Sequence, residues 1–383
     1  MKSVTYRSVL LAVLMITSSL AGCLGDGADD ADDTDVVDPI VVDPVTSSGS
    51  VMVSTYHVGE LVKAVVGDHV DVHYMSQENI PVHDYDPSAS DLIRLKEADV
   101  FFYHGLGLEP WVEGALEGLG DDAPPSFMTH TMPTGEETLD YQSVLVSNLC
   151  KLMNEGPFET TILGMMPEDH YDHDDHDDHD DHSDEEGDHD DHSGEIEADD
   201  GEAAFDYDPH SWLDPLSFNE QLNLVLEKLT AAFPDLADAF AENAATYSAE
   251  LLELHGAFEQ ALGEQGTCEM GGSTKTIVAN HNAYSYISLR YDLDIMTVHG
   301  LDPEGEPSPA DVAEVVEKIN DEGITVLFVE EYTDQTSVQS IVEETGVEVK
   351  ILYTMEMRPS DSQDDYLSMM NKNINNIVSG LGC

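Results

Sequence analysis

The fold is decided by residues 51–67, VMVSTYHVGELVKAVVG, in which a strand is followed at once by a helix. Residues 51–56 form a strand-like run, and residues 58–66 have the apolar spacing of a helix that is stopped by Gly67. Strands alternating with helices predict a parallel sheet. The same reading predicts further strands at 70–75, 99–103 and 126–129, and helices at 90–98 and from 105 onward.

The C-terminal third repeats this alternation, which predicts a second α/β unit. Strands are expected at 276–281, 295–298, 326–330 and 347–353, and helices at 282–291, from Ser308 and at 363–381. Residues 216–263 between the two units have a helical pattern, interrupted at Pro234. A helix of roughly 28 residues would be about 40 Å long, enough to bridge two domains, although the same pattern suits a helix packed on one domain.

The charge of the chain narrows the classes of partner. Asp and Glu number 80 against 13 Lys and Arg, giving a formal net charge of −67. Nucleic acids and anionic substrates are therefore excluded as expected partners, because phosphate binding needs clustered Lys and Arg. Such a field attracts cations, and it also suits an acidic, halophilic surface that stays soluble in high salt.

The N-terminus has the features of a secretory signal. Lys2 and Arg7 precede a short apolar run that ends in Leu20-Ala21-Gly22-Cys23. This ending predicts a lipoprotein signal peptide at 1–22 and a lipid on Cys23; the alternative is an ordinary cleavage site beside a chance cysteine. We expect an extracytoplasmic protein, anchored by lipid to the outer face of the cytoplasmic membrane. Residues 23–49 have no aromatic side chain and predict an acidic, flexible tether.

Three cysteines remain in the exported chain, so that one is left over from any disulfide. They are Cys150, Cys268 and Cys383, and their spacing matches no cysteine-based zinc motif. We favour a Cys268–Cys383 disulfide because both residues flank the second unit.

A tract of histidine and acid occupies residues 167–204, with histidine at every third position from His173 to His182. Repulsion among so many carboxylates argues against a stable helix, which predicts a mobile loop. The loop is either a weak, multi-site metal collector or a solvated segment with no role. Imidazole is a borderline-soft ligand that solvation alone does not require, so we favour metal capture.

Three histidines outside the tract are candidate metal ligands. His83 and His281 follow predicted strands in different units, and His210 lies at the junction. Ligands bind beyond the carboxyl ends of such strands, so two units facing each other would bring the three imidazoles together. Three imidazoles and one oxygen form an ordinary zinc site, whereas manganese prefers more carboxylate. His104 also follows a strand, and a lone loop histidine such as His83 is often only a polar turn residue.

Five motifs resemble the zinc- and manganese-binding solute-binding proteins of ABC transporters, the ZnuA-like group. They are His83-Asp84-Tyr85-Asp86-Pro87-Ser88, Asp208-Pro209-His210-Ser211-Trp212-Leu213-Asp214-Pro215, His281-Asn282-Ala283-Tyr284-Ser285-Tyr286, Gly305-Glu306-Pro307-Ser308-Pro309 and Leu327-Phe328-Val329-Glu330-Glu331. The resemblance covers the chain from about residue 50 to its end. The His-rich insertion before the second motif is also similar to zinc members of the group.

The resemblance implies an α/β fold of two parallel-sheet domains joined by one long, rigid helix, with the metal in the interdomain cleft. It implies His83, His210 and His281 as ligands of transported Zn²⁺, with Mn²⁺ as the alternative. The fourth ligand of the group is often an aspartate in the loop after the last strand. That column holds Met355 here, so Glu356 or water is the expected fourth ligand.

The predicted domains follow the chain in order. They are the signal peptide (1–22), the tether (23–49), the N-terminal α/β domain (50–166), the His/Asp-rich loop (167–204), the end of the N-terminal domain (205–216), the linking helices (217–263) and the C-terminal α/β domain (264–383).

Three functions compete. The favoured one is a monomeric binding protein that captures Zn²⁺ and delivers it to an ABC permease and its ATPase. A surface adhesin or metal-buffering lipoprotein would suit the same anchor and tether. A zinc hydrolase could use Glu330 or Glu331 as its base, but the sequence contains no nucleophile elbow or HExxH motif, so we do not expect an enzyme.

Overall fold

The computed structural model describes residues 49–76, 80–82, 84–140, 207–298, 309–333 and 335–383, which belong to one compact unit, Val45–Cys383. Several predicted features lie outside the described residues: the signal peptide, the tether up to residue 48, the His/Asp-rich loop, and Cys23, His83, Cys150 and the 305–308 motif. The predicted domain boundaries stay predictions.

The N-terminal part of the described chain, called the N-lobe, is built on a parallel sheet. Its strands are β1 (Ser50–Val53), β2 (Asp71–Tyr74), β3 (Val100–Tyr103) and β4 (Ser126–Met128), in the order β2-β1-β3-β4. Its helices are α1 (Tyr56–Val66), α2 (Ala89–Lys96) and α3 (Val112–Leu119). Ser88 caps α2 with a capping box. Its hydroxyl accepts from the backbone N–H of Asp91, and the Asp91 carboxylate accepts from the backbone N–H of Ser88.

The C-terminal part, called the C-lobe, has the same sheet order. Its parallel strands β5 (Thr276–Ala279), β6 (Asp294–Thr297), β7 (Val326–Val329) and β8 (Glu348–Ile351) run β6-β5-β7-β8. Its helices are α7 (Thr267–Gly271), α8 (Ser285–Tyr291), α9 (Pro309–Glu322), α10 (Gln339–Thr345) and α11 (Tyr366–Leu381). The prediction of two parallel-sheet α/β domains is confirmed.

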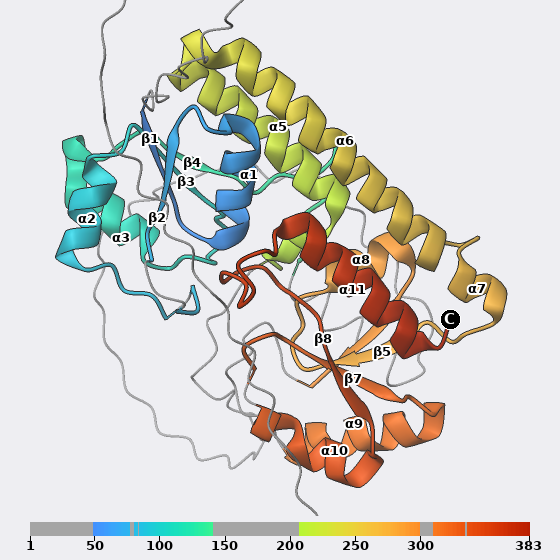
Figure 1. Cartoon of the computed structure of the whole chain (residues 1–383). Helices are drawn as coiled ribbons and strands as arrows, with labels where there is room; N and C mark the ends of the chain where they lie inside the picture. The colour runs from blue at the N-terminus through green and yellow to red at the C-terminus, as the bar shows by residue number, and fades with distance from the viewer. Residues whose placement is uncertain (1–48, 77–79, 83, 141–206, 299–308, 334) are drawn as a thin grey trace, which may run out of the picture. The chain divides into compact units, whose positions relative to one another are not determined.

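Two helices connect the lobes. Helix α5 (Pro215–Ala232) and helix α6 (Ala237–Leu262) lie side by side, and the turn between them includes Pro234, where the sequence predicted a break (Figure 1). Asn243 of α6 donates to the Val65 carbonyl of the N-lobe, and α6 also packs against α11 of the C-lobe. The long helix therefore contacts both lobes, as predicted.

One apolar core runs through both lobes. It joins Val51 and Phe102 of the N-lobe to Trp212, to Phe258 of α6 and to Tyr366 of the C-lobe. Smaller clusters cover the other face of each sheet. Burial of this continuous apolar surface stabilises the lobes against each other.

Cys268 and Cys383 form a disulfide, so the favoured pairing is confirmed. The helix predicted from residue 282 begins only at Ser285, because the buried residues His281 to Tyr284 form a turn in which Ser285 donates to the Asn282 side chain. Among the described residues, no helix has the length and apolar character needed to cross a membrane.

Candidate metal centre

In each sheet the strand order reverses between two neighbours, β1 and β3 in the N-lobe and β5 and β7 in the C-lobe. Open parallel sheets bind ligands beyond the carboxyl ends of the strands at this point. In the C-lobe, His281 follows β5 and Glu330 follows β7. The ring Nδ1 of His281 contacts the Glu330 carboxylate, so the switch point holds an oriented imidazole.

His210 begins a short 3-10 helix, η2 (His210–Leu213), just before α5. The turn η2 ends where α5 begins. Asp214 caps α5 by accepting from the backbone N–H groups of Leu216 and Ser217, and Pro215 takes the first helical position. His210 is buried. Its place in the short turn just before the capped start of α5 restricts where its ring can point.

Glu356 lies in the loop after β8, which crosses to the N-lobe. The backbone N–H groups of Tyr56 and His57, at the start of α1, donate to the carbonyls of Glu356 and Met355 at 3.1 Å each. Met355 has a φ of 59°, which is unusual for a residue with a side chain. The loop therefore turns sharply at Met355 and is held there by the first turn of α1.

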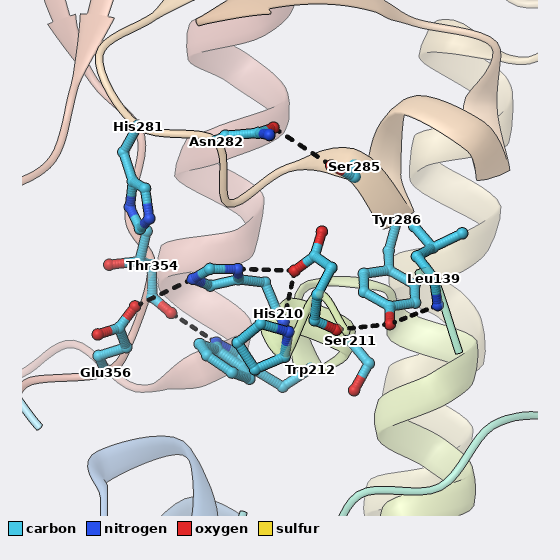
Figure 2. Close-up of polar contacts among 12 residues, drawn as sticks. Leu139, His210, Ser211, Trp212, His281, Asn282, Ser285, Tyr286, Thr354 and Glu356 are labelled. Atoms are coloured by element: carbon cyan, nitrogen blue, oxygen red, sulfur yellow. Dashed lines mark hydrogen bonds and ion pairs between the residues drawn. The ribbon is translucent and has the colours of Figure 1, made fainter. Parts of the chain in front are cut away.

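These segments bring three side chains together. The ligand atoms of His210, His281 and Glu356 all lie within 4.8 Å of one another, and His210 Nε2 is 3.5 Å from a Glu356 carboxylate oxygen. The centroids of the His210 and His281 rings are 4.9 Å apart, and the ring planes are nearly perpendicular. Figure 2 shows the His210 ring joined by a dashed line to Glu356, with His281 above it. Two nitrogens and an oxygen gathered this closely are a donor set of the kind that binds a divalent cation.

A carboxylate orients each imidazole from behind. Asp208 Oδ1 accepts from both the backbone N–H and the ring Nδ1 of His210, at 2.9 and 2.8 Å. Glu330 makes the equivalent contact to Nδ1 of His281. Since Nδ1 carries the donated hydrogen, Nε2 of each ring is left to bind an ion. Such outer carboxylates are typical of histidine metal sites, because they fix the tautomer and raise the basicity of the ligand.

Asp208 is itself held by the C-lobe. The Tyr286 hydroxyl of α8 donates to the Asp208 carbonyl at 2.7 Å and accepts from the Leu139 backbone N–H at 3.1 Å. These bonds tie the residue that orients His210 to the helix that follows His281 (Figure 2).

The carboxylates dominate the electrostatics of His210. Burial by itself lowers its pKa, but the hydrogen bond and charge of Asp208, with those of Glu356, outweigh burial and raise the pKa to about 10. Without a cation, the His210 ring is therefore an imidazolium between two acids. A divalent cation would take over this role, because it satisfies the same carboxylates without the proton.

A recess lies beside Glu356. It is lined by residues of both lobes, among them Val82 and Tyr85 from the loop after β2 and Met357 and Arg358 from the loop after β8. The guanidinium of Arg358 lies over the Tyr74 ring at 4.4 Å. The loop that carries His83 in the sequence therefore reaches the Glu356 side of the site at residues 82 and 85.

The structure brings together His210, His281 and Glu356 of the predicted set, while His83 and Cys23 lie outside the described residues. Metal ligation by these residues stays a prediction. The orienting roles of Asp208 and Glu330 were not predicted. Asp208 stands two residues before His210, and Glu330 directly follows an apolar strand run, so an acid at each position was a readable signal.

The chain is similar to known metal-binding proteins. The family described as "ZnuA: Zinc-uptake complex component A periplasmic" matches residues 51–380. The zinc-binding lipoprotein AdcA of Streptococcus pneumoniae is 26% identical over 332 residues, which is 85% of this chain and 54% of AdcA. The chain thus spans about half the length of the AdcA relatives. The manganese-binding lipoprotein MntA of Halalkalibacterium halodurans is 24% identical over 384 residues, covering 100% of this chain and 99% of MntA.

Solved structures share the fold. The Zn(II)-bound ZnuA-like domain of Streptococcus pneumoniae AdcA has a TM-score of 0.60 at 22% identity, over 88% of this chain and 99% of that one. The laminin-binding protein Lmb of Streptococcus agalactiae, described as bifunctional with adhesin and metal transporting activity, has a TM-score of 0.61 at 22% identity, over 87% and 99%. Since the family match at 51–380 covers most of the sequence, the chain belongs to the ZnuA family of zinc-uptake components.

Proposed function

We propose that this protein is an extracytoplasmic solute-binding protein that captures Zn²⁺ and delivers it to an ABC permease and its ATPase. The observation that carries the proposal is the convergence of two buried imidazoles and Glu356 within 4.8 Å, each imidazole with its Nδ1 on a carboxylate. The family description as a zinc-uptake component supports it.

His83 is the proposed third imidazole. The neighbouring residues Val82 and Tyr85 line the recess that also contains Glu356, which supports a place for this loop at the site. With His83, the donor set is three nitrogens and one carboxylate, a common zinc arrangement. The same set is poorer in oxygen than manganese prefers, which favours Zn²⁺ over the ion named for MntA.

The test is a titration of the purified chain with Zn²⁺ and with Mn²⁺ in competition with a chelator. We expect one tight Zn²⁺ site that is lost in His210→Ala and in Glu356→Ala and is kept in His73→Ala, which changes an exposed histidine on β2. Deletion of residues 167–204 should leave the tight site in place. If tight binding instead disappears with the loop and is indifferent to His210, the protein is a metal-buffering lipoprotein.

The location is part of the proposal. Relatives are named lipoproteins and the family is described as periplasmic, which supports export of this chain. We assign the lipid to Cys23 and the stand-off from the membrane to the tether. Cys23→Ser should move the protein from the membrane fraction to the soluble fraction, without changing its Zn²⁺ affinity. A membrane-bound Cys23→Ser protein would show that the anchor lies elsewhere.

An adhesin role is the second candidate, because the Lmb structure is described with adhesin activity. Immobilised laminin separates the two functions. A solute-binding protein should bind laminin no better than a matched acidic protein does, whereas saturable binding would favour the adhesin.

A further inference from the structure

Three buried histidines of the N-lobe lie outside the proposed ligand set. His57 follows β1, His104 follows β3 and His130 follows β4, so all three stand at the carboxyl edge of the sheet. His57 and His104 are fully buried and His130 is nearly so. A histidine this deeply buried usually has a hydrogen-bond partner, so the contacts of each ring indicate its role.

Each ring contacts a different residue beside His210. His104 Nε2 is 2.7 Å from the Pro209 carbonyl oxygen, and His130 Nδ1 is 2.8 Å from the Ser211 hydroxyl. The His57 ring stacks on Trp212 with centroids 3.9 Å apart and planes within 7°. Histidines from one edge of the sheet therefore contact Pro209, directly before His210, and Ser211 and Trp212, directly after it.

The hydrogen-bond partners determine which ring nitrogens of His104 and His57 carry hydrogen. A carbonyl oxygen can only accept, so Nε2 of His104 carries its hydrogen. Burial lowers the pKa of His104 well below its ordinary value, so the ring is neutral and its Nδ1 is an acceptor. His57 Nε2, 3.2 Å away, must then donate to that Nδ1. The hydrogen bonds run one way, from His57 to His104 to the Pro209 carbonyl.

The other nitrogen of His57 is poorly satisfied. His57 Nδ1 has no hydrogen bond of normal geometry among the described residues, while the Met355 backbone acts on the ring and opposes the fall in the pKa of His57 that burial causes. An unsatisfied buried acceptor costs about 1–3 kcal/mol in general. A core that needed only bulk at this place would avoid that cost with an apolar side chain. The polar ring is retained where its one donor reaches His104.

We propose that His57 and His104 are positioning residues for the metal centre: their directional hydrogen bonds hold the Pro209 carbonyl, and through it the backbone of His210. This inference rests on the proposed zinc function. If His104 took the other tautomer, a bare Nε2 would face the Pro209 oxygen at 2.7 Å, and the repulsion would displace the segment. A metal site tolerates little displacement of its ligands, because its geometry must be held closely.

The test compares His104→Leu with His104→Gln in the full chain. Leucine fills the space but cannot donate, whereas the glutamine amide can donate to Pro209 and accept from His57. His57→Phe keeps an aromatic ring on Trp212 and removes the donor to His104. His73→Gln, on the exposed face of β2, is the matched control.

We expect His104→Leu and His57→Phe to weaken Zn²⁺ binding about 10- to 100-fold, as changes behind metal ligands usually do, and His104→Gln to recover most of the loss. The visible spectrum of bound Co²⁺ should change in the weakened variants and not in His73→Gln. Equal Zn²⁺ affinity in His104→Leu and the wild type would overturn the inference. So would equal losses in the leucine and glutamine variants, because the donor would then be irrelevant.

A second measurement does not depend on the folding of the variants. Long-range ¹H–¹⁵N correlation spectra of the histidine-labelled wild type at pH 7 should show His57 and His104 as neutral rings with hydrogen on Nε2. Hydrogen on Nδ1 of either ring would refute the proposed direction. Failure of the wild type to bind Zn²⁺ would be a different result, since it would refute the proposed function and leave the tautomers as measured.

Discussion

The indole N–H of Trp212 donates a 2.6 Å hydrogen bond to the carbonyl oxygen of Thr354. Trp212 lies two residues after His210, and Thr354 lies two residues before Glu356 (Figure 2). One buried bond therefore fixes the distance between the segments that carry two of the proposed ligands. The separation of His210 and Glu356 is set by backbone and indole, so it does not depend on the bound ion alone.

Trp212→Phe removes this bond and leaves the Thr354 carbonyl without its donor. A lost buried hydrogen bond lowers the free energy of unfolding by about 1–3 kcal/mol. We expect a loss of this size in denaturant unfolding, together with weaker Zn²⁺ binding in chelator competition.

Trp111→Phe is the matched control for the indole. The Trp111 N–H is buried and makes no hydrogen bond to the described residues, so its removal costs no bond. Its Zn²⁺ affinity should equal that of the wild type. A fall in affinity as large as that of Trp212→Phe would show that loss of indole volume, and not the Thr354 bond, controls the site.

Asp208→Asn tests the carboxylate behind His210. The amide oxygen can still accept from the ring Nδ1, but the negative charge that strengthens the ligand is lost. Changes of this kind lower metal affinity about 10- to 100-fold. Isothermal titration with Zn²⁺ measures the effect, with Asp68→Asn on the exposed surface as the charge-matched control. Equal affinities of the two variants would assign Asp208 a purely structural role.

Zinc binding should release a proton from His210. Its carboxylate partners overcome the effect of burial and raise its pKa to about 10, so the ring is protonated at pH 7 when no ion is bound. Zn²⁺ needs the neutral ring, so the ion and the proton compete. Affinity should rise as the pH is raised from 6 towards 10, by up to tenfold per pH unit for this one proton.

Calorimetry in buffers of different ionisation enthalpy counts the proton directly. At pH 7 the observed enthalpy of Zn²⁺ binding should depend on the buffer, and Asp208→Asn should reduce that dependence because it lowers the pKa of His210. An enthalpy that is the same in every buffer would show that His210 is already neutral in the free protein.

Much of the fold could be predicted because local sequence patterns indicate its strands and helices. Short apolar runs such as 326–329 alternate with amphipathic helices, and the Pro234 break is a local event. The site was predicted less completely. Glu356 was named from resemblance, but its geometry depends on the left-handed turn at Met355, which is supported by tertiary contacts with α1 that the sequence does not reveal. The role of His57 is likewise invisible in sequence, because its partners are 47 and 155 residues away along the chain, at positions 104 and 212.

The Cys268–Cys383 disulfide closes a loop across the whole C-lobe, with a sequence separation of 115. Cross-links mainly restrict the unfolded chain, and loss of one typically lowers the free energy of unfolding by about 2–4 kcal/mol. The Cys268→Ser, Cys383→Ser double variant should therefore melt at a lower temperature than the oxidised wild type. A reductant should lower the wild-type melting temperature and leave that of the double variant unchanged. Equal melting temperatures of both proteins without reductant would contradict the prediction.

Arg290 of α8 makes the ion pairs that join the lobes beside the site. Its guanidinium donates to Glu136 at 2.7 and 2.5 Å, and to Asp214, the cap of α5, at 2.6 Å. Lysine keeps the charge but cannot reach both carboxylates with a planar fork. Because Asp214 is buried, Arg290→Lys should lower the free energy of unfolding by about 1–3 kcal/mol.

The exposed pair Lys96–Asp122 provides the control for Arg290, since both of its side chains are about half exposed or more. Lys96→Met should change stability little, because exposed ion pairs are screened by water and salt. Urea unfolding at low and high salt separates the two cases: the loss in Arg290→Lys should persist at 1 M salt, where surface charges are screened within about 3 Å. A loss that vanishes in salt would mean that the Arg290 pairs act as surface charges and do not hold the lobes together.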